Sequence, residues 1–338
     1  MNVSEILNKV VNGCDLSFAE AESAMRNIMD GKLTSAQIAA LAVSLRIKGE
    51  TEDEIAGFVT AMKDGAIHLP QFFPDSVDTC GTGGDKLNTF NISTVAAIVA
   101  SGAGVIIAKH GNRSASSKSG SADVLESLGI NLNVNIGTEL RALNEIGIAF
   151  LFARAHHPAL KHAGAARKEI GIRTIFNLIG PMTNPAGARI QLMGVFREAD
   201  IIKVANVLKK LGAKRAMVVS GHDGMDEISL SSTTDIAELK DNNIISYQIS
   251  PEDFGIKTAS LETIKGGLPD DNAKITLEIL SGSCGPRADI VLLNAGAVIY
   301  LSGKTDCIKS GIELARQSIS SGAAAKKLHQ LIAITNSS

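Results

Sequence analysis

The chain contains no tryptophan, and aromatic residues make up only 4% of its 338 residues. Proteins that bind single-stranded nucleic acid stack bases on aromatic side chains, so this scarcity argues against such a surface. The formal net charge of −2 offers no general attraction for nucleic acid or for an anionic membrane. The sequence therefore favours a small anionic ligand over nucleic acid or a membrane as the partner.

Cysteine and long apolar runs are also scarce. The four cysteines are scattered and form no C-x-x-C pair, which indicates neither a disulfide framework nor a zinc site. No apolar run reaches the ~18 residues that a membrane-spanning helix needs, and the N-terminus has no secretion-signal pattern. We therefore expect a soluble protein in the reducing cytoplasm.

The length predicts two domains, because a single core usually stops growing at roughly 250–300 residues. Over residues 1–70, apolar residues recur at helical spacing between glycine stops, which predicts a small helical domain. Its apolar stripes would form a core or a dimer face. Three capping boxes predict helix starts: Ser17 with Glu20, Thr34 with Gln37, and Thr51 with Glu54.

From residue 71 to 338, short apolar strands alternate with helices, which predicts an α/β domain with a mainly parallel central sheet. Strands are expected at residues 105–108, 149–152, 191–196 and 216–220, with helices at 122–128, 200–211, 289–297 and 307–318 and a β-rich stretch over 227–247.

A glycine-rich run, Gly81-Thr82-Gly83-Gly84-Asp85, follows an apolar patch. Glycines at these positions let backbone N–H groups approach an anionic oxygen closely. A few residues later, hydroxyl-bearing residues open an apolar helix, whose first N–H groups also attract anions. The two segments predict a phosphate site; the alternative is an ordinary strand-to-helix turn with Ser93 as the N-cap.

Two further segments carry charge at expected strand ends. Residues 109–117 present two cations, an amide and several hydroxyls, typical of a phosphate-binding loop or of a solvated basic loop. Asp226 and Glu227 leave the strand that ends at Ser220, and adjacent carboxylates on an exposed strand end suit Mg²⁺. The alternative for this pair is a solvated acidic turn.

Two histidines and an arginine complete the candidates. His156 and His157 lack the H-E-x-x-H pattern of a zinc site, and His157 is expected to line a pocket. Arg167 lies on a helix predicted from near Pro158 towards Gly171. It would either bind a carboxylate at the cleft or remain a surface cation near the helix C-terminus.

Together these segments resemble the anthranilate phosphoribosyltransferase family over nearly the whole chain, with the elements in the family's order. The resemblance rests on Gly81–Asp85, Asn91–Thr94, Lys109–Arg113, Gly171–Asn177, Gly180–Pro185 and Asp226–Glu227.

The resemblance implies transfer of a phosphoribosyl group from 5-phosphoribosyl 1-diphosphate (PRPP) to anthranilate. It also implies Mg²⁺ as cofactor and a homodimer formed through the helical domain, which would take in part of residues 161–185. Matching PRPP contacts are Gly81, Gly84, Asp85, Thr89, Asn91, Ile92, Ser93, Thr94, Lys109, His110, Gly111, Asn112, Arg113, Ser114, Ala115, Ser116, Ser117 and Ser121. Matching Mg²⁺ ligands are Ser93, Asp226 and Glu227, and matching anthranilate contacts are Gly81, Asn112 and Arg167.

Two other functions remain open at this point. A pyrimidine nucleoside phosphorylase of related architecture would lack the adjacent acids Asp226 and Glu227, which are present here. A non-catalytic relative that binds nucleic acid would carry a cationic excess, which a net charge of −2 does not supply.

Overall fold

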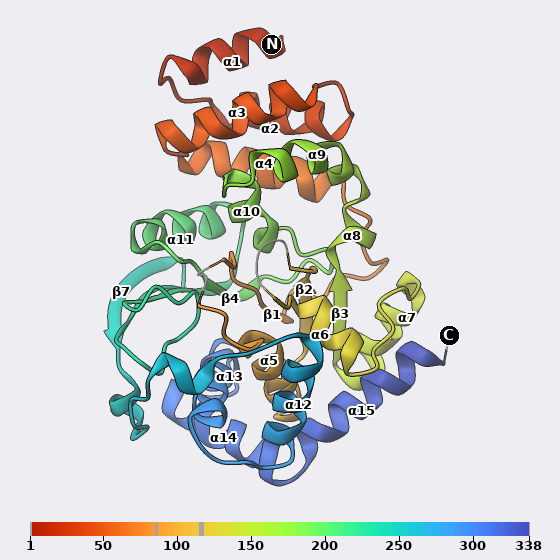
Figure 1. Cartoon of the computed structure of the whole chain (residues 1–338), viewed down its shortest axis with the longest axis vertical. Coiled ribbons are helices and arrows are strands. Elements are labelled where there is room, and N and C mark those ends of the chain that lie inside the picture. The colour runs from red at the N-terminus through yellow and green to blue at the C-terminus, as the bar shows by residue number, and fades with distance from the viewer. Residues whose placement is uncertain (1, 85–86, 115–117, 338) are drawn as a thin grey trace.

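A computed structural model describes residues 2–84, 87–114 and 118–337. Helices near the N-terminus form one end of the molecule, drawn at the top of Figure 1. The three predicted capping boxes are confirmed at the starts of the second, third and fourth helices. In this group α2 packs on α4 and α1 packs on α3. The four helices are α1 (Val3–Val11), α2 (Phe18–Met29), α3 (Ser35–Lys48) and α4 (Glu52–Asp64).

A later part of the chain returns to this helical end. The returning helices are α8 (Ala153–His156), α9 (Lys161–Ile170) and α10 (Ile175–Ile179). Of these, α9 packs on α2 and α3, and α10 packs on α3 and α4 (Figure 1). The helical end is therefore built from two stretches of chain, and α9 carries Arg167 as predicted.

A seven-stranded sheet forms the centre of the molecule, in the order β3-β2-β1-β4-β5-β6-β7. Neighbours from β3 to β5 pair in parallel, and β6 and β7 are antiparallel, so the predicted mainly parallel sheet is confirmed. The strands are β1 (Val77–Thr79), β2 (Ile107–Gly111), β3 (Ile148–Phe152), β4 (Ile190–Gly194), β5 (Arg215–Gly221), β6 (Thr234–Lys240) and β7 (Asn243–Ile249).

Helices cover both faces of this sheet (Figure 1). Because side chains alternate along a strand, Leu192 and Met193 of β4 enter different apolar cores, one on each face. The second core continues into the helical end. No helix within the described residues is long and apolar enough to cross a membrane. The remaining helices are α5 (Ile92–Gly102), α6 (Ser121–Ser127), α7 (Ile136–Arg141), α11 (Ile201–Lys210), α12 (Pro269–Leu280), α13 (Pro286–Leu301), α14 (Ile308–Ser320) and α15 (Ala323–Asn336).

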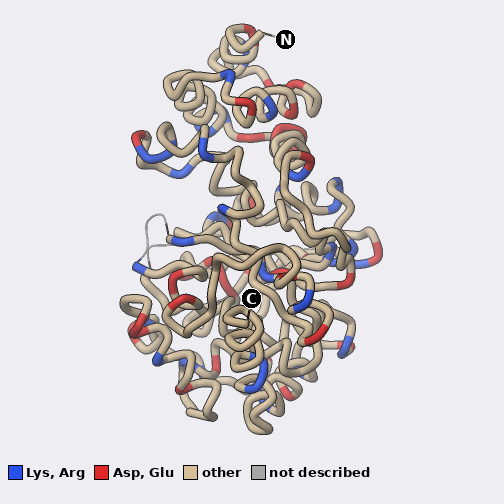
Figure 2. The backbone as a smooth tube through the Cα atoms, turned by 90° about the vertical axis from the view of Figure 1, so that its right-hand side faces the viewer, with Lys and Arg blue, Asp and Glu red and all other residues tan. Residues whose placement is uncertain are grey.

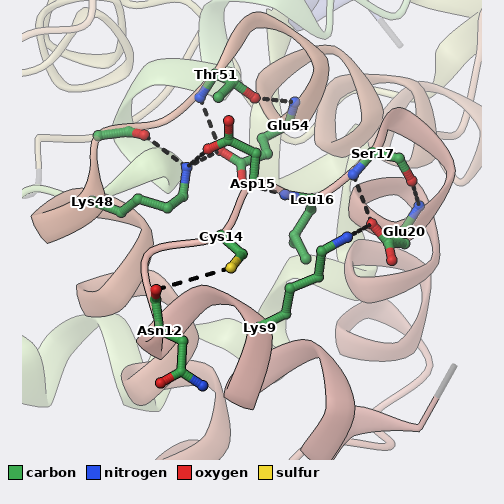
Figure 3. Close-up of polar contacts among 11 residues, drawn as sticks. Lys9, Asn12, Cys14, Asp15, Leu16, Ser17, Glu20, Lys48, Thr51 and Glu54 are labelled. Atoms are coloured by element: carbon green, nitrogen blue, oxygen red, sulfur yellow. Dashed lines mark hydrogen bonds and ion pairs between the residues drawn. The ribbon is translucent and has the colours of Figure 1, made fainter.

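Basic and acidic residues are interspersed along both ends of the molecule (Figure 2). A buried ion pair links the end of α3 to the first turn of α4 (Figure 3). The Lys48 ammonium lies 2.9 Å from the carboxylate of Glu54, whose side chain is 0% exposed. That carboxylate also accepts hydrogen bonds from the backbone N–H groups of Leu16 and Thr51, at 2.9 Å and 2.8 Å. Glu54 therefore joins the start of α4 to the α1–α2 connection.

Replacing Glu54 should strongly destabilise the fold. Glu54→Ala leaves the N–H groups of Leu16 and Thr51 without their acceptor in a buried place, and it leaves Asp15 as the remaining carboxylate beside Lys48. Loss of one partner of a buried pair costs about 3–5 kcal/mol. Urea unfolding of the variant and the wild type measures this cost. The matched control is Glu20→Ala, the same capping-box position of α2 in a more exposed place, where about 1 kcal/mol is expected. Equal losses in the two variants would contradict the assigned role of Glu54.

Candidate active site

Loops at the carboxyl ends of the parallel strands meet beneath the helical end and enclose a cleft of about 1530 Å³, including space open to solvent. Open α/β sheets bind their ligands at this edge. Every candidate residue within the described part of the chain lines the cleft: Gly81, Gly84, Thr89, Asn91, Ile92, Ser93, Thr94, Lys109, His110, Gly111, Asn112, Arg113, Ser114, Ser121, Arg167, Asp226 and Glu227. The candidates Asp85, Ala115, Ser116 and Ser117 lie outside the described residues.

The glycine-rich loop follows β1 and requires glycine for two different reasons. Gly83 and Gly84 have φ values of +66° and +74°, in the left-handed region that favours glycine. Gly81 has an ordinary φ, but a Cβ there would lie 2.4 Å from Oδ2 of Asp226. The loop therefore packs directly against the acidic pair, although Gly83 and Asp226 are 143 residues apart along the chain.

The acidic pair is held by backbone groups of two other segments. Asp226 Oδ2 accepts a hydrogen bond from Gly83 N–H at 2.6 Å, and Glu227 Oε1 accepts one from Ser93 N–H at 3.2 Å. Asp226 is only 8% exposed, so the expectation of an exposed strand end is wrong for this residue. The chain turns back sharply after β5, with Gly221 N–H donating to Met225 C=O, and carries Asp226 under the glycine-rich loop.

The basic segment begins inside the sheet, which corrects its predicted position. Strand β2 starts at Ile107, two residues later than expected, and continues through Gly111. Lys109 and His110 are 4% and 3% exposed, so the alternative of a solvated basic loop is wrong for these two residues.

Lys109 is buried among oxygen atoms at the strand ends. Its ammonium donates to the backbone carbonyl of Thr79 and lies 3.5 Å from Oγ of Ser93. Asp78 lies nearby and accepts hydrogen bonds from His110 N–H and from the Asn184 amide, at 3.0 Å and 2.8 Å. Burial raises the pKa of Asp78 to about 6, although the positive charge of Lys109 opposes this shift. The group thus fixes a cation at the floor of the cleft.

Arg113 is held on the rim of the cleft by two carboxylates of α6. Its guanidinium lies 2.8 Å from Glu126 and 2.9 Å from Asp123, which raise its pKa above the usual value. Asp123 also accepts hydrogen bonds from the N–H groups of Ser114 and Gly120, at 3.1 Å and 2.9 Å. These contacts bring both ends of the loop that follows β2 onto one carboxylate.

The opposite end of the cleft is more apolar. Arg167 stacks over the ring of Phe176 at 5.5 Å, and Met62, Leu160 and Pro181 also line the space. His157 lines it as predicted, with Nε2 3.1 Å from the carbonyl oxygen of Thr183, and its ring lies 5.3 Å from the ring of His110. A cation beside apolar walls suits a ligand with a carboxylate and a flat apolar body.

The histidines at this end of the cleft are neutral near pH 7. Burial lowers the pKa of His157 to about 4 and lowers that of His110 well below its usual value. His156 points elsewhere: Nε2 lies 3.0 Å from the Glu139 carboxylate and Nδ1 lies 2.6 Å from the carbonyl oxygen of Ile67. Although burial alone would lower it, the Glu139 contact raises the pKa of His156.

Two residues that shape the cleft were missed by reasoning from the sequence. The Arg173 guanidinium lies 4.1 Å from the centre of the Phe196 ring and donates to the carbonyl oxygen of Thr82 at 3.3 Å. It fills the space where Gly84 lacks a side chain, since a Cβ there would lie 2.0 Å from Nη2. At Gly194 a Cβ would lie 1.5 Å from the backbone oxygen of Asp226. Sequence spacing carries no signal for either contact, because the partners are distant along the chain.

The oxygen atoms at the glycine-rich loop fit Mg²⁺. One or two carboxylates, completed by water and ligand phosphate, are the usual donors for this ion, and Asp226, Glu227 and the Ser93 hydroxyl are such oxygens. Asp226 bonds to the backbone of the glycine-rich loop and Glu227 to that of the first turn of α5, which brings the two carboxylates to one place. Among the residues that the structure describes, no cluster of three or more His, Cys, Asp or Glu residues forms a complete metal cage.

Comparison with known proteins identifies the family. Residues 4–66 match the helical bundle domain of a glycosyl transferase family, and residues 74–325 match its α/β domain. Anthranilate phosphoribosyltransferase from Desulfosudis oleivorans is 50% identical over 335 residues, which cover 99% of both chains. The enzyme of that name from Petrotoga mobilis is 49% identical, over 98% of this chain and 96% of its own. This chain belongs to the anthranilate phosphoribosyltransferase family.

Solved structures of the family share the fold. The anthranilate phosphoribosyltransferase of Thermus thermophilus superposes with a TM-score of 0.93 at 42% identity, covering 98% of this chain and 99% of its own. The Saccharomyces cerevisiae enzyme in complex with PRPP and Mg gives a TM-score of 0.90 at 28% identity, covering 99% and 98%. The small helical part with a larger, mainly parallel α/β part is thus a property of the family.

Acidification should destabilise the protein through the neutral histidines of the cleft. A group whose pKa is lowered by folding contributes stability above its unfolded pKa of 6.5, and that stability is lost as the pH falls towards about 4. Protonation of His157 alone should therefore lower the free energy of unfolding by about 2 kcal/mol at pH 5, relative to pH 7.5. Urea unfolding at pH 7.5 and pH 5 measures this loss, and His157→Gln should reduce it.

His156→Gln is the matched control for this measurement. The pKa of His156 is raised, so its contribution is present below pH 6.5 and is lost as the pH rises. Its replacement should therefore enlarge the loss of stability at pH 5. If the two variants changed the pH dependence in the same direction, the assigned protonation states would be wrong.

Proposed function

We propose that this protein transfers the phosphoribosyl group of PRPP to the amine of anthranilate, giving N-(5-phosphoribosyl)anthranilate and diphosphate in tryptophan biosynthesis. One observation carries this assignment: the described residues expected to contact each of the two substrates line the same cleft. The names of the relatives support it, and so does a Saccharomyces cerevisiae relative solved in complex with 4-fluoroanthranilate.

The phosphate groups of PRPP bind at the polar end of the cleft. The glycine-rich loop and the start of α5 line this end, where the positive end of the helix dipole and the buried charge of Lys109 favour an anion. Ser93, Asp226 and Glu227 would hold Mg²⁺, which when bound neutralises negative charge on the diphosphate. Fixed donors of this kind stabilise the charge that develops on diphosphate as it leaves the ribose.

Anthranilate binds at the apolar end, with its carboxylate on Arg167 and with Gly81 and Asn112 beside it. The guanidinium offers a planar pair of donors that matches a carboxylate. The neutral rings of His110 and His157 leave this end free of further charge. Because the amine of anthranilate is neutral at pH 7, the chain's main contribution is to hold the two substrates in line.

The proposal extends to a homodimer and to a cytoplasmic location. Residues 1–70, with part of 161–185, form a helical domain through which two chains pair, and residues 71–338 form the catalytic domain. Val11 and Ile47 at the helical end are 66% and 80% exposed, which supports an interface there. The protein acts in the cytoplasm, and sedimentation of the purified chain would report the dimer.

Two alternative functions are not favoured by the comparisons. The relatives are named anthranilate phosphoribosyltransferases, whereas the alternatives were a pyrimidine nucleoside phosphorylase and a non-catalytic nucleic-acid-binding relative. The net charge of −2 also lacks the cationic excess that a nucleic-acid-binding relative would carry.

Loss of anthranilate fluorescence on incubation with PRPP and Mg²⁺ tests the proposed reaction. Turnover should need both substrates and should stop when the metal is chelated, because the diphosphate charge is then no longer neutralised. The paired variant Asp226→Asn/Glu227→Gln should lower kcat/KM on the order of a hundredfold. Phosphorolysis of thymidine or uridine without metal, together with unchanged anthranilate, would replace this assignment with the phosphorylase.

Arg167→Ala should weaken anthranilate binding selectively. Loss of a hydrogen bond to a charged group should raise the KM for anthranilate about tenfold or more, and the KM for PRPP should stay within about twofold. Steady-state kinetics with each substrate varied in turn measures both constants. The matched control is Lys168→Ala, the exposed next residue on α9, which should change neither. An equal rise in both constants for Arg167→Ala would mean that the carboxylate is held elsewhere.

A further inference from the structure

The segment that leads into α12, residues 264–272, packs beside the end of the cleft where the phosphate groups are proposed to bind. Lys265 forms an antiparallel bridge with Thr89, and Gly266 N–H donates to the carbonyl oxygen of Asn88 at 2.8 Å. The approach is so close that a Cβ on Gly266 would lie 2.7 Å from the backbone of Phe90. The segment therefore supports the loop that lines the cleft between the glycine-rich loop and α5.

Asn272, in the first turn of α12, extends this support through its side chain. It is 1% exposed, and both ends of its amide are used. Oδ1 accepts a hydrogen bond from Gly267 N–H at 2.8 Å, and Nδ2 donates to Oδ1 of Asn91 at 3.0 Å. Asn272 thus connects α12 to the residue that begins α5.

The amide of Asn91 carries the connection to a third segment. Its Nδ2 donates to the carbonyl oxygen of Ser119 at 3.2 Å, and its Oδ1 accepts from Oγ of Ser119 at 3.1 Å. Ser119 lies at the end of the loop that follows β2, just before α6. The two side-chain amides of Asn272 and Asn91 therefore join α12, the start of α5 and the loop after β2.

These bonds also explain an unusual helix start. Asn91 is the N-cap of α5, and asparagine is among the best N-cap residues, yet its side chain makes no capping hydrogen bond. Its oxygen is directed instead to Asn272 and Ser119. The N–H of Ser93, which a cap would otherwise take, donates to the carboxylate of Glu227. The orientation of Asn91 thus decides which acceptor Ser93 meets.

We propose that Asn272 is a positioning residue for PRPP binding: through Asn91 it keeps the α5 N-terminus open towards the acidic pair and holds the loop after β2 beside it. This inference rests on the proposed function. Asn272 itself touches neither substrate and acts only through Asn91 and Ser119.

Two substitutions of Asn272 test the proposal. Asn272→Asp keeps the size and the acceptor for Gly267 N–H but removes the donor to Asn91, and Asn272→Ala removes both. Each should raise the KM for PRPP about tenfold while the KM for anthranilate stays within about twofold. The matched control is Thr276→Val, one turn along α12 and equally buried, whose hydroxyl donates to the Asn272 carbonyl oxygen. It should leave both constants unchanged.

A double-mutant cycle separates positioning from a general loss of stability. Asn91→Ala combined with Asn272→Ala should raise the KM for PRPP no more than Asn91→Ala alone, because the two residues act in series. Thermal unfolding identifies any variant that fails to fold. If an alanine variant fails, the KM for PRPP of Asn272→Asp tests the proposal instead.

Calorimetric titration of PRPP with Mg²⁺ keeps this inference separate from the proposed reaction. Wild-type protein that consumes anthranilate, together with Asn272→Asp protein that binds PRPP normally, would overturn the role of Asn272 alone. Wild-type protein that neither consumes anthranilate nor binds PRPP would overturn both. An equal rise in both KM values for Asn272→Asp would also reject selective positioning.

Discussion

The contact between the Asp226 carboxylate and the glycine-rich loop is the constraint on which the cleft depends. It places the carboxylate oxygen 2.6 Å from the backbone nitrogen of Gly83 and leaves no room for a Cβ at Gly81, while the backbone of Asp226 leaves none at Gly194. The ends of β1, β4 and β5 therefore pack backbone to backbone at this point. A carboxylate held by a backbone N–H group in a buried place is fixed in position, and a fixed oxygen binds a metal ion with little reorganisation.

Features of the fold that depend on residues close together in the sequence were predicted correctly. Helix starts at Ser17, Thr34 and Thr51 depend on partners three residues away, and the mainly parallel sheet depends on the alternation of apolar strands with helices. The candidate phosphate segments were proposed from glycines and hydroxyls near expected strand ends, and their individual PRPP contacts from the family resemblance. Their gathering in one cleft follows from a single rule, that the carboxyl ends of parallel strands meet at one edge.

Long-range contacts account for what the sequence could not predict. Lys109 was expected in a loop because the apolar run of the predicted strand ends at Ala108, yet Thr79 and Ser93 supply oxygens that make its burial possible. Asp226 was expected on an exposed strand end, and it is buried because the glycine-rich loop covers it. The partners of Asn272 and Arg173 lie 181 and 91 residues away along the chain, so no spacing rule could find them.

His156 and His157 show how neighbouring residues of one type acquire opposite properties. Both are buried, but His156 faces the Glu139 carboxylate and gains a raised pKa, whereas His157 faces a backbone carbonyl and another histidine and is held neutral. The two side chains point in different directions, so His156 forms an ion pair away from the cleft and His157 forms part of the cleft wall. The structural pair joins α7 to the α4–β1 connection through Ile67, so the charge stays outside the apolar end. Arg167 lies over the Phe176 ring on the wall of the same cleft, and a carboxylate of the proposed substrate would meet its guanidinium there in a partly desolvated place, where such a contact is stronger than in water.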